Sequence, residues 1–438
     1  MPPCSNMREE AMAGLDTTAG TRISTSSRYP NYVLGVLFIV TMLNFLDRQI
    51  ISILAEPVKR DLGLSDTQIG LMTGLSFAIF YTTLAIPVAA LADKWNRSRI
   101  IAIAIAIWSA MTVACGLAAN FVQLFLARVG VGIGEAGSAP ASHSLIADLF
   151  PPERRAGALG ILGMSVPIGA FIAYAGGGWV AENFSWRVAF LIAGLPGIII
   201  AVIIWFTVPD PRGNVSLAAA FKPDPNRTSL KEALIELSSK PAYWHLVAAG
   251  VLVQFVSYGL ASFYGGLFVR VHGIGYGELG WKLGVMVGLS GGFGAWLGGR
   301  AGDYFGKLRP TLPLLVAAMV MVVATPGMIW AIYGPSANMA VILLAIPTFA
   351  ATFYYGPNFA ALQKLASDET RAMAVAIYLL IAGIIGLGVG PVFVGMLSDM
   401  FVSELGEAAA LQRALAILAF FNIWAGFHFW RATRSMPH

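Results

Sequence analysis

Residues Asn120 to Leu149 read NFVQLFLARVGVGIGEAGSAPASHSLIADL, an apolar stretch rich in glycine. Its centre, Gly132 to Gly137, fits the G-x-G-x-x-G pattern of a dinucleotide-binding turn. That pattern indicates a nucleotide site only where it follows a strand and opens a helix. The stretch is too long for a strand. We therefore interpret it as a membrane-spanning helix, in which small residues let neighbouring backbones approach closely.

The composition supports a bilayer environment. Hydrophobic residues make up 57% of the chain and charged residues only 12%, about half the charged fraction of an ordinary soluble domain. A helix needs roughly 20 apolar residues to cross about 30 Å of hydrocarbon, and we find twelve such runs. They lie near residues 31–58, 67–92, 99–118, 121–149, 156–181, 186–208, 242–270, 280–302, 311–333, 338–362, 372–400 and 409–431. The sequence thus predicts an all-α membrane protein with twelve transmembrane helices.

The runs form two sets of six, separated by a polar loop rich in proline and charge. ALADKWNRSR, Ala90 to Arg99, follows the second run, and the similar RAGDYFGKLR, Arg300 to Arg309, follows the eighth. PPERRAGALG after the fourth run and SDETRAMAVA after the tenth align in the same way. Such repeats predict two pseudo-symmetric halves. The predicted segments are a disordered cytoplasmic tail (1–30), a first bundle (31–208), a cytoplasmic linker (209–240), a second bundle (241–432) and a tail (433–438).

Lysine and arginine are concentrated on one side of the predicted membrane. If both termini are cytoplasmic, that side carries 20 of the 28 residues and the other side 6, while Arg48 and Arg128 lie inside spans. Because positively charged loops favour the cytoplasmic side, we expect both termini to lie in the cytoplasm. We expect the membrane to be the inner membrane of a bacterium. The positive charges are spread over many loops, which argues against a nucleic-acid partner. We expect a monomer whose partners are bilayer lipids and a small amphipathic solute.

The loop after the second run resembles the G-x-L-x-D-R-x-G-R-x-R motif of the major facilitator superfamily. Its places are taken by Ala89, Leu91, Asp93, Lys94, Asn96, Arg97 and Arg99, without the two glycines. The stretches LNFLDRQIISIL, RVGVGIGEAGSAPASHSLIADLFPPERRA and FSWRVAFLIAGLPG are similar to the Spinster branch, whose members are associated with export of sphingolipids and lysophospholipids. The resemblance implies the major facilitator fold and transport of a lipid-like solute.

Four ionisable residues lie inside predicted spans: Asp47, Arg48, Arg128 and Glu135. A charge at bilayer depth costs roughly 2.5 to 3.5 kcal/mol on insertion scales, so it normally faces a cavity or a partner. Arg128 and Glu135 are seven residues apart and share a helix face, whereas Asp47 and Arg48 point about 100° apart. One hypothesis is that Arg48 or Arg128 binds an anionic head group, while Glu135, with Asp47 second, carries the coupled proton. The other is a buried ion pair that only orients the fourth span against the first.

The second half offers uncharged candidates instead. Tyr258 in the seventh span, and Tyr354, Tyr355 and Asn358 in the tenth, are predicted to line an aromatic wall that binds the rest of the substrate. The alternative is that these aromatic residues only pack the helices together.

The loop charges of the repeat suggest a gate. Asp93 and Arg97 follow the second span, and Asp303 and Lys307 stand at the matching place after the eighth. We predict that these four close the cytoplasmic side and stabilise an outward-facing state. The alternative is that they are solvated charges that only set the topology.

These observations predict a secondary transporter that moves an amphipathic or lipid-like solute by alternating access, an anionic one if a buried arginine binds its head group. We expect coupling to a proton gradient and neither a bound cofactor nor a metal. An organic-anion symporter is the alternative, because the LDRQ stretch, Leu46 to Gln49, also resembles the anion:cation symporter branch. A membrane enzyme or receptor is the third hypothesis. The sequence contains no H-E-x-x-H or Walker motif, so we do not expect an enzyme.

Overall fold

A computed structural model of the protein describes residues 28–213 and 230–436. Most of the predicted N-terminal tail and about half of the predicted linker therefore lie outside the described residues. Within the described ranges every regular element is a helix, as the all-α prediction requires. The first half contains α1 (Tyr29–Leu62), α2 (Asp66–Gly70), the π-helix η1 (Leu71–Leu75), α3 (Ser76–Lys94), α4 (Arg97–Leu117), α5 (Phe121–Glu135), α6 (Ser138–Leu149), α7 (Pro152–Asn183) and α8 (Trp186–Thr207).

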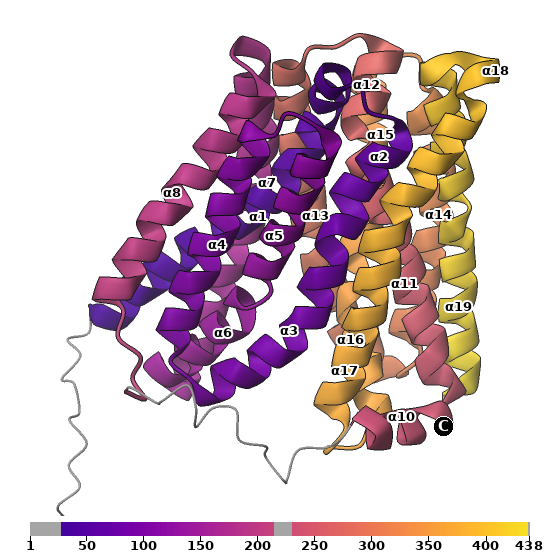
Figure 1. The fold of residues 1–438 in the computed structure, drawn as a ribbon. Helices are drawn as coiled ribbons and strands as arrows, with labels where there is room; N and C mark the ends of the chain where they lie inside the picture. The colour runs from indigo at the N-terminus through magenta and orange to yellow at the C-terminus, as the bar shows by residue number, and fades with distance from the viewer. Residues whose placement is uncertain (1–27, 214–229, 437–438) are drawn as a thin grey trace, which may run out of the picture.

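The second half begins with a short helix that the sequence did not predict, α10 (Leu230–Ser238). It lies across the end of this half (Figure 1). The remaining elements are α11 (Pro241–Ser262), α12 (Tyr264–His272), α13 (Tyr276–Leu308), α14 (Leu312–Tyr333), α15 (Ala337–Phe353), α16 (Tyr355–Leu365), α17 (Arg371–Ile381), the π-helix η2 (Ala382–Val389), α18 (Gly390–Ala419) and α19 (Phe421–Ser435).

These elements form the twelve predicted passes, several of which are built from two or three pieces. By length and hydropathy, nine helical stretches of the described chain qualify as spans, and the last, Arg371–Ser435, contains two passes. Gly406, with non-helical dihedral angles inside α18, separates those two. Two of the twelve passes are missing from the nine. The fourth is missing because α5 and α6 have only 15 and 12 residues, and the eighth, α13, is long enough at 33 residues but does not qualify by its composition. The helices also extend past the predicted limits: α1 begins at Tyr29, where Pro30 suits a first turn.

The break between α5 and α6 follows from the sequence. Pro140 has no N–H to donate to the carbonyl of Ala136, one turn earlier. Gly134 and Gly137 are also poor helix formers. As a result α5 ends at Glu135. A broken helix is tolerated within a membrane protein where the surrounding protein or a cavity satisfies its backbone. Because of this break, the carboxylate of Glu135 lies at the end of α5, in the interior of the first half.

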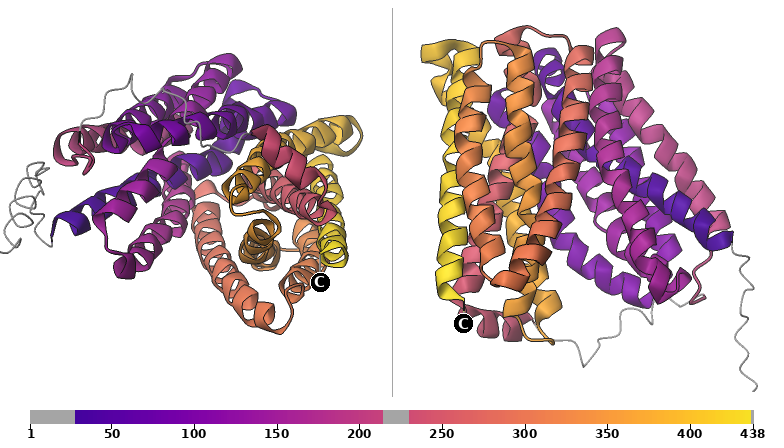
Figure 2. Two further views of the ribbon diagram at one scale, coloured as in Figure 1. Left: turned by 90° about the horizontal axis from the view of Figure 1, so that it is seen from below. Right: turned by 180° about the vertical axis from the view of Figure 1, so that it is seen from behind.

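The two halves lie side by side, and they meet most closely at one end of the bundle (Figures 1 and 2). We call the end at which α1 begins and α19 ends the terminal end, and the opposite end, where α12 ends, the far end. Two glycine contacts join the halves toward the far end. A Cβ on Gly178 of α7 would lie 2.3 Å from the carbonyl oxygen of Tyr276, and one on Gly74 of η1 would lie 2.6 Å from that of Gly388. The backbones are therefore in direct contact there.

Candidate functional site

A buried ion pair joins α1 to the end of α5. Arg48 donates from Nη2 to Glu135 Oε2 at 2.7 Å and from Nε to the same oxygen at 3.3 Å. The side chain of Glu135 is fully buried, whereas that of Arg48 is 11% exposed. Arg48 also donates to Asn44 Oδ1, one turn earlier on α1, at 3.4 Å. Glu135 thus pairs with Arg48 of the first span. The seven-residue spacing had suggested Arg128, on the same helix as Glu135, as its partner.

Asp47 and Arg128 complete this buried charge cluster (Asp47, Arg48, Arg128 and Glu135). Both are 1% exposed. The carboxylate of Asp47 lies within electrostatic reach of Glu135 and Arg128, and the hydroxyl of Thr112 on α4 is a polar neighbour. Neither Asp47 oxygen has a hydrogen bond of good geometry within the described chain. With all four groups ionised the cluster is neutral, so any proton or ligand that enters it changes a balanced set of charges.

Aromatic rings hold the two guanidinium groups in place. The Cζ atom of Arg48 lies 4.5 Å from the centroid of Tyr81 and 5.1 Å from that of Phe77, both on α3. Arg128 lies 5.5 Å from the centroid of Phe77. A cation over an aromatic face is stabilised by about 0.5 to 2 kcal/mol, more where water is excluded. A glycine makes this arrangement possible: a Cβ on Gly132 of α5 would lie 2.6 Å from the carbonyl oxygen of Phe77.

Two cavities lie between the halves next to this cluster. The larger, about 470 Å³, is the entrance cavity. Arg48, Tyr81 and Thr82 line it from the first half, and Met373 and Leu380 from the second. It extends toward the terminal end, where Glu369 lines it. The smaller cavity, about 170 Å³, is the deep chamber, lined by Gln49, Tyr174, Tyr264 and Thr348 among others. Gln254, Tyr258 and Tyr355 line both cavities and therefore separate them.

Of the residues predicted to bind substrate, Arg48, Tyr258 and Tyr355 face these cavities. The other three line neither cavity. Tyr354 is fully buried, and its hydroxyl lies 3.1 Å from that of Tyr378. It differs from Tyr355 because successive residues on a helix point about 100° apart. Asn358 and Arg128 are likewise enclosed, so a contact between either and a substrate requires a different conformation and stays a prediction.

The comparison with known proteins decides the family. Residues 37–391 match the family model "Major Facilitator Superfamily". The chain belongs to the major facilitator superfamily. An "MFS-type efflux pump" of Mycolicibacterium smegmatis is 35% identical over 384 residues, 88% of each chain. The "Hexuronate transporter" of Bacillus subtilis is 32% identical over 192 residues, 43% of this chain and 45% of that one.

A solved structure places this facilitator close to the Spinster branch. It is described as a bacterial homolog to the human lysosomal transporter Spinster, in an inward-facing and unoccupied conformation. The match has a TM-score of 0.84 and 33% identity, and it covers 94% of this chain and 98% of the other. The predicted fold and family are therefore confirmed. The protein is an integral, multi-pass membrane transporter of the Spinster-like type.

In this facilitator three of the predicted gate residues, Arg97, Asp303 and Lys307, form no described ion pair between the halves. Arg97 is fully buried and pairs with Asp148 and Asp210, each at 2.7 Å, within the first half. Asp303 and Lys307 are exposed on α13 and form no ion pair in the described parts of the chain. The side chain of Asp93 lies outside the described residues. The entrance cavity lies between the halves at this end, so the gate stays a prediction for a conformation closed there.

The hydrogen bonds of Arg97 instead stabilise a corner within the first half. Asp210, just after α8, accepts from Arg97 Nη2 and Nε and from its backbone N–H at 2.7, 3.1 and 2.7 Å. Burial alone would raise the pKa of the Asp210 carboxyl, but these hydrogen bonds outweigh burial and hold that pKa at about 2. The carboxylate therefore stays ionised and fixes the start of α4 to the end of α8.

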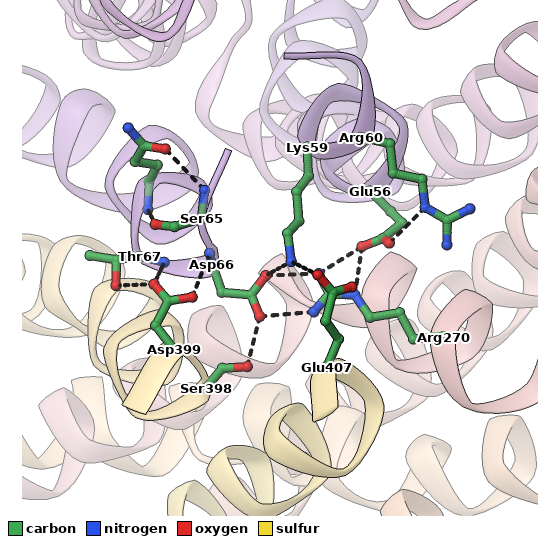
Figure 3. Close-up of polar contacts among 11 residues, drawn as sticks. Glu56, Lys59, Arg60, Ser65, Asp66, Thr67, Arg270, Ser398, Asp399 and Glu407 are labelled. Atoms are coloured by element: carbon green, nitrogen blue, oxygen red, sulfur yellow. Dashed lines mark hydrogen bonds and ion pairs between the residues drawn. The ribbon is translucent and has the colours of Figure 1, made fainter. Parts of the chain in front are cut away.

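An ion cluster that the sequence did not predict joins the two halves at the far end (Figure 3). It consists of Glu56 and Lys59 of α1, Asp66 of α2 and Arg270 of α12. Arg270 donates to Glu56 at 2.7 Å and, through two nitrogens, to Asp66 at 2.8 Å. Lys59 lies 2.9 Å from Asp66. We call these four residues the far-end cluster.

Hydrogen bonds from α18 extend this contact. Asp399 accepts from the backbone N–H and hydroxyl of Thr67 at 2.8 and 2.6 Å and from the backbone N–H of Asp66 at 3.0 Å. Ser398 donates to Asp66 at 2.7 Å. A carboxylate at the start of α2 satisfies N–H groups that have no partner within the helix. The one signal in the sequence was that these charges stand at the ends of predicted spans, where they resembled ordinary loop charges.

Proposed function

We propose that the protein is a secondary transporter that moves an amphipathic anionic solute by alternating access. The observation that carries this proposal is the position of Arg48. Its guanidinium lines the entrance cavity between the halves and is held from behind by Glu135. An arginine offers a planar, bidentate donor pair to a phosphate or carboxylate. The apolar wall of the cavity, with Ile86, Met373 and Leu380, suits the hydrocarbon part of the same solute.

The conformation supports a cycle with two access states. The far end is closed by the far-end cluster and the glycine contacts. The relative with a TM-score of 0.84 is described as inward-facing. We infer that the terminal end faces the cytoplasm and that the structure is the inward-facing state. We further propose a monomer in the inner membrane of a bacterium, in contact with bilayer lipids.

Coupling to protons follows from the same ion pair. When an anionic solute binds Arg48, it competes with Glu135 for the guanidinium. A carboxylate that loses its partner inside the protein is costly to keep ionised, so it takes up a proton. Asp47, buried beside Glu135 and Arg128, is the second candidate for the coupled acid. Solute binding and proton uptake thus become linked at one residue.

An organic-anion symporter is the alternative function. The local similarity to a hexuronate transporter favours it, and the same arginine would bind a sugar carboxylate. The two proposals differ in the hydrophobic part of the solute. Transport of glucuronate without transport of lysolipids would support the alternative.

Replacing Arg48 tests the proposal. Arg48→Lys keeps the charge but loses the planar donor pair, so flux of oleoyl lysophosphatidylglycerol into proteoliposomes is expected to fall about tenfold, equivalent to about 1.4 kcal/mol. Arg300→Lys is the matched control, because Arg300 also stacks on an aromatic ring, at 5.0 Å from Trp296, but lies on α13 outside both cavities. Unchanged flux in Arg48→Lys, at equal protein insertion, would contradict the proposed site.

A further inference from the structure

The deep chamber differs chemically from the entrance cavity. No Asp, Glu, Lys, Arg or His is among its described lining residues. Its wall nevertheless carries many hydroxyl and amide groups, contributed by both halves: Gln49, Tyr174, Gln254, Ser257, Tyr258, Tyr264, Thr348, Thr352, Tyr355 and Asn422. The chamber is therefore uncharged, with polar groups set among apolar side chains such as Leu260 and Met321, whereas Arg48 and Glu369 line the entrance cavity.

Several of these groups retain hydrogen-bonding capacity. The Tyr174 hydroxyl donates to Gln49 Oε1 at 3.2 Å, and no partner for the amide nitrogen of Gln49 occurs in the described chain. Thr348 donates to the carbonyl of Leu344 at 2.8 Å, which leaves its oxygen free to accept further bonds. The Tyr264 hydroxyl lies 3.4 Å from that oxygen. Donors and acceptors therefore face the chamber from α1, α12 and α15.

The size and polarity of the chamber limit what can occupy it. A space of about 10–15 Å³ holds one water molecule, so about 170 Å³ accommodates a group of several non-hydrogen atoms. Water in such a chamber bonds to the wall, and an alkyl chain that displaces it cannot replace those bonds. A hydroxyl- or amide-bearing group can. The wall therefore offers hydrogen-bonding partners to an uncharged group that bears hydroxyls or amides.

We propose that the deep chamber binds an uncharged, hydroxyl-bearing part of the transported solute, next to the anionic group at Arg48. This inference rests on the proposed function, because it takes the anion at Arg48 as given. Gln254, Tyr258 and Tyr355 line both cavities, so a solute that bridges them passes between these side chains. The transporter then selects anions that carry a hydroxylated group on one side and an apolar part on the other.

The test compares two ligands that differ only in hydroxyl groups. Oleoyl lysophosphatidylglycerol carries a glycerol on its phosphodiester, and the propyl phosphodiester of the same lysolipid has an equal charge and chain but no hydroxyls in that group. Binding to the purified protein is measured by calorimetry. We expect the wild type to prefer the glycerol ester by about tenfold, since the polar groups of the wall stay unpaired with the propyl ester.

Two variants and one matched control locate the preference. Gln49→Leu and Thr348→Val each remove a polar group of the chamber and are expected to lower the ratio of the two affinities about fivefold. Thr82→Val is the control, because Thr82 lines only the entrance cavity and its hydroxyl also bonds to the carbonyl one turn earlier, that of Ala78. We expect this variant to keep the wild-type ratio.

The outcomes separate the two proposals. Equal wild-type affinity for both ligands overturns the chamber subsite and leaves the anion site intact. The chamber subsite is also overturned if both Gln49→Leu and Thr348→Val keep the wild-type preference. It is overturned as well if Thr82→Val loses the preference to the same extent as those two variants. If the wild type binds neither ligand, the proposed function fails and this inference fails with it.

Discussion

Arg48 belongs to two environments at once. Its guanidinium bonds to the buried Glu135 on one side and lines the entrance cavity on the other, between the rings of Tyr81 and Phe77. A fully enclosed ion pair would be closed to solutes, and a fully solvated arginine would bind anions weakly. The intermediate position makes the pair strong but accessible to a competitor.

At the residue scale we predict that the two buried acids differ in function. Glu135→Gln mimics the protonated acid, so it is expected to bind oleoyl lysophosphatidylglycerol but to show no response of flux to an imposed pH gradient. Asp47→Asn is expected to weaken binding as well, because Arg128 then lacks its nearby carboxylate. Flux into proteoliposomes is measured with and without the gradient. If both variants keep gradient-driven flux, the acids form a structural ion-pair network only.

The sequence predicted that the four charges of this cluster lie inside the protein, but not how they pair. Glu135 and Arg128 share a helix face, yet Glu135 bonds to Arg48 because α5 ends at Glu135 and brings its carboxylate to α1. That pairing depends on the distance between two helices, which spacing along one helix does not contain. The same limit applies to Tyr354 and Tyr355, of which only Tyr355 faces the cavities.

At the scale of elements, α10 attaches the start of the second half to the corner between α16 and α17. Glu236 accepts from the backbone N–H and hydroxyl of Ser367 at 3.0 and 2.9 Å and from the hydroxyl of Thr370 at 2.6 Å. Lys240 pairs with the same carboxylate and donates to the carbonyl of Leu365 at 2.7 Å. This corner carries Glu369, which lines the entrance cavity. The sequence suggested a linker for the residues of α10 because their composition is polar. A helix of nine residues gives too little periodic signal to be predicted.

We predict that Glu236 keeps this corner ordered over the physiological pH range. The hydrogen bonds from Lys240 and Thr370 hold the pKa of its carboxyl at about 2, below the ordinary value of about 4.3. A depressed pKa gives stability that is fully present above the ordinary value and is lost as the pH falls toward 2. Glu236→Gln is therefore expected to speed amide hydrogen exchange at residues 366–370 at pH 7 several-fold. Glu404→Gln, an exposed acid on α18, is the control and should leave that exchange unchanged; equal rates in wild type and Glu236→Gln would contradict the attachment.

At the scale of the whole molecule, the ion pairs of the far-end cluster join the halves at one end of the bundle. The far-end cluster, the bonds from Asp399 and the glycine contacts lie on that side. The entrance cavity occupies the other side. The repeat in the sequence predicted the two halves, but it could not predict which end is closed, because one sequence must encode both states of a transport cycle.

Weakening the far-end cluster is predicted to shift the population toward the opposite state. Asp66→Asn removes a buried carboxylate that Arg270, Lys59 and Ser398 contact, so the closed far end loses stability. Alkylation of a cysteine placed at Ala376, which lines the entrance cavity, is expected to slow at least fivefold, equivalent to about 1 kcal/mol.

The control is Asp61→Asn, since Asp61 pairs with Arg187 inside the first half at the same end. Its alkylation rate should match that of the parent. An unchanged rate in Asp66→Asn would show that the cluster does not stabilise this state. The predicted gate is tested in the same experiment: adding Asp303→Asn to Asp66→Asn should restore rapid alkylation if Asp303 helps to close the terminal end.

The attachment of α10 to the second half also determines where the polypeptide can be cut into two pieces. Ala233 and Leu237 are fully buried against the second half, and Glu236 bonds to Ser367. A cut between Gly213 and Leu230 would therefore leave each bundle with its own terminal helices intact. The arginine bridges and backbone contacts at the far end would remain to join the pieces. Two separately encoded polypeptides, produced in the same cell, should then assemble into one working carrier.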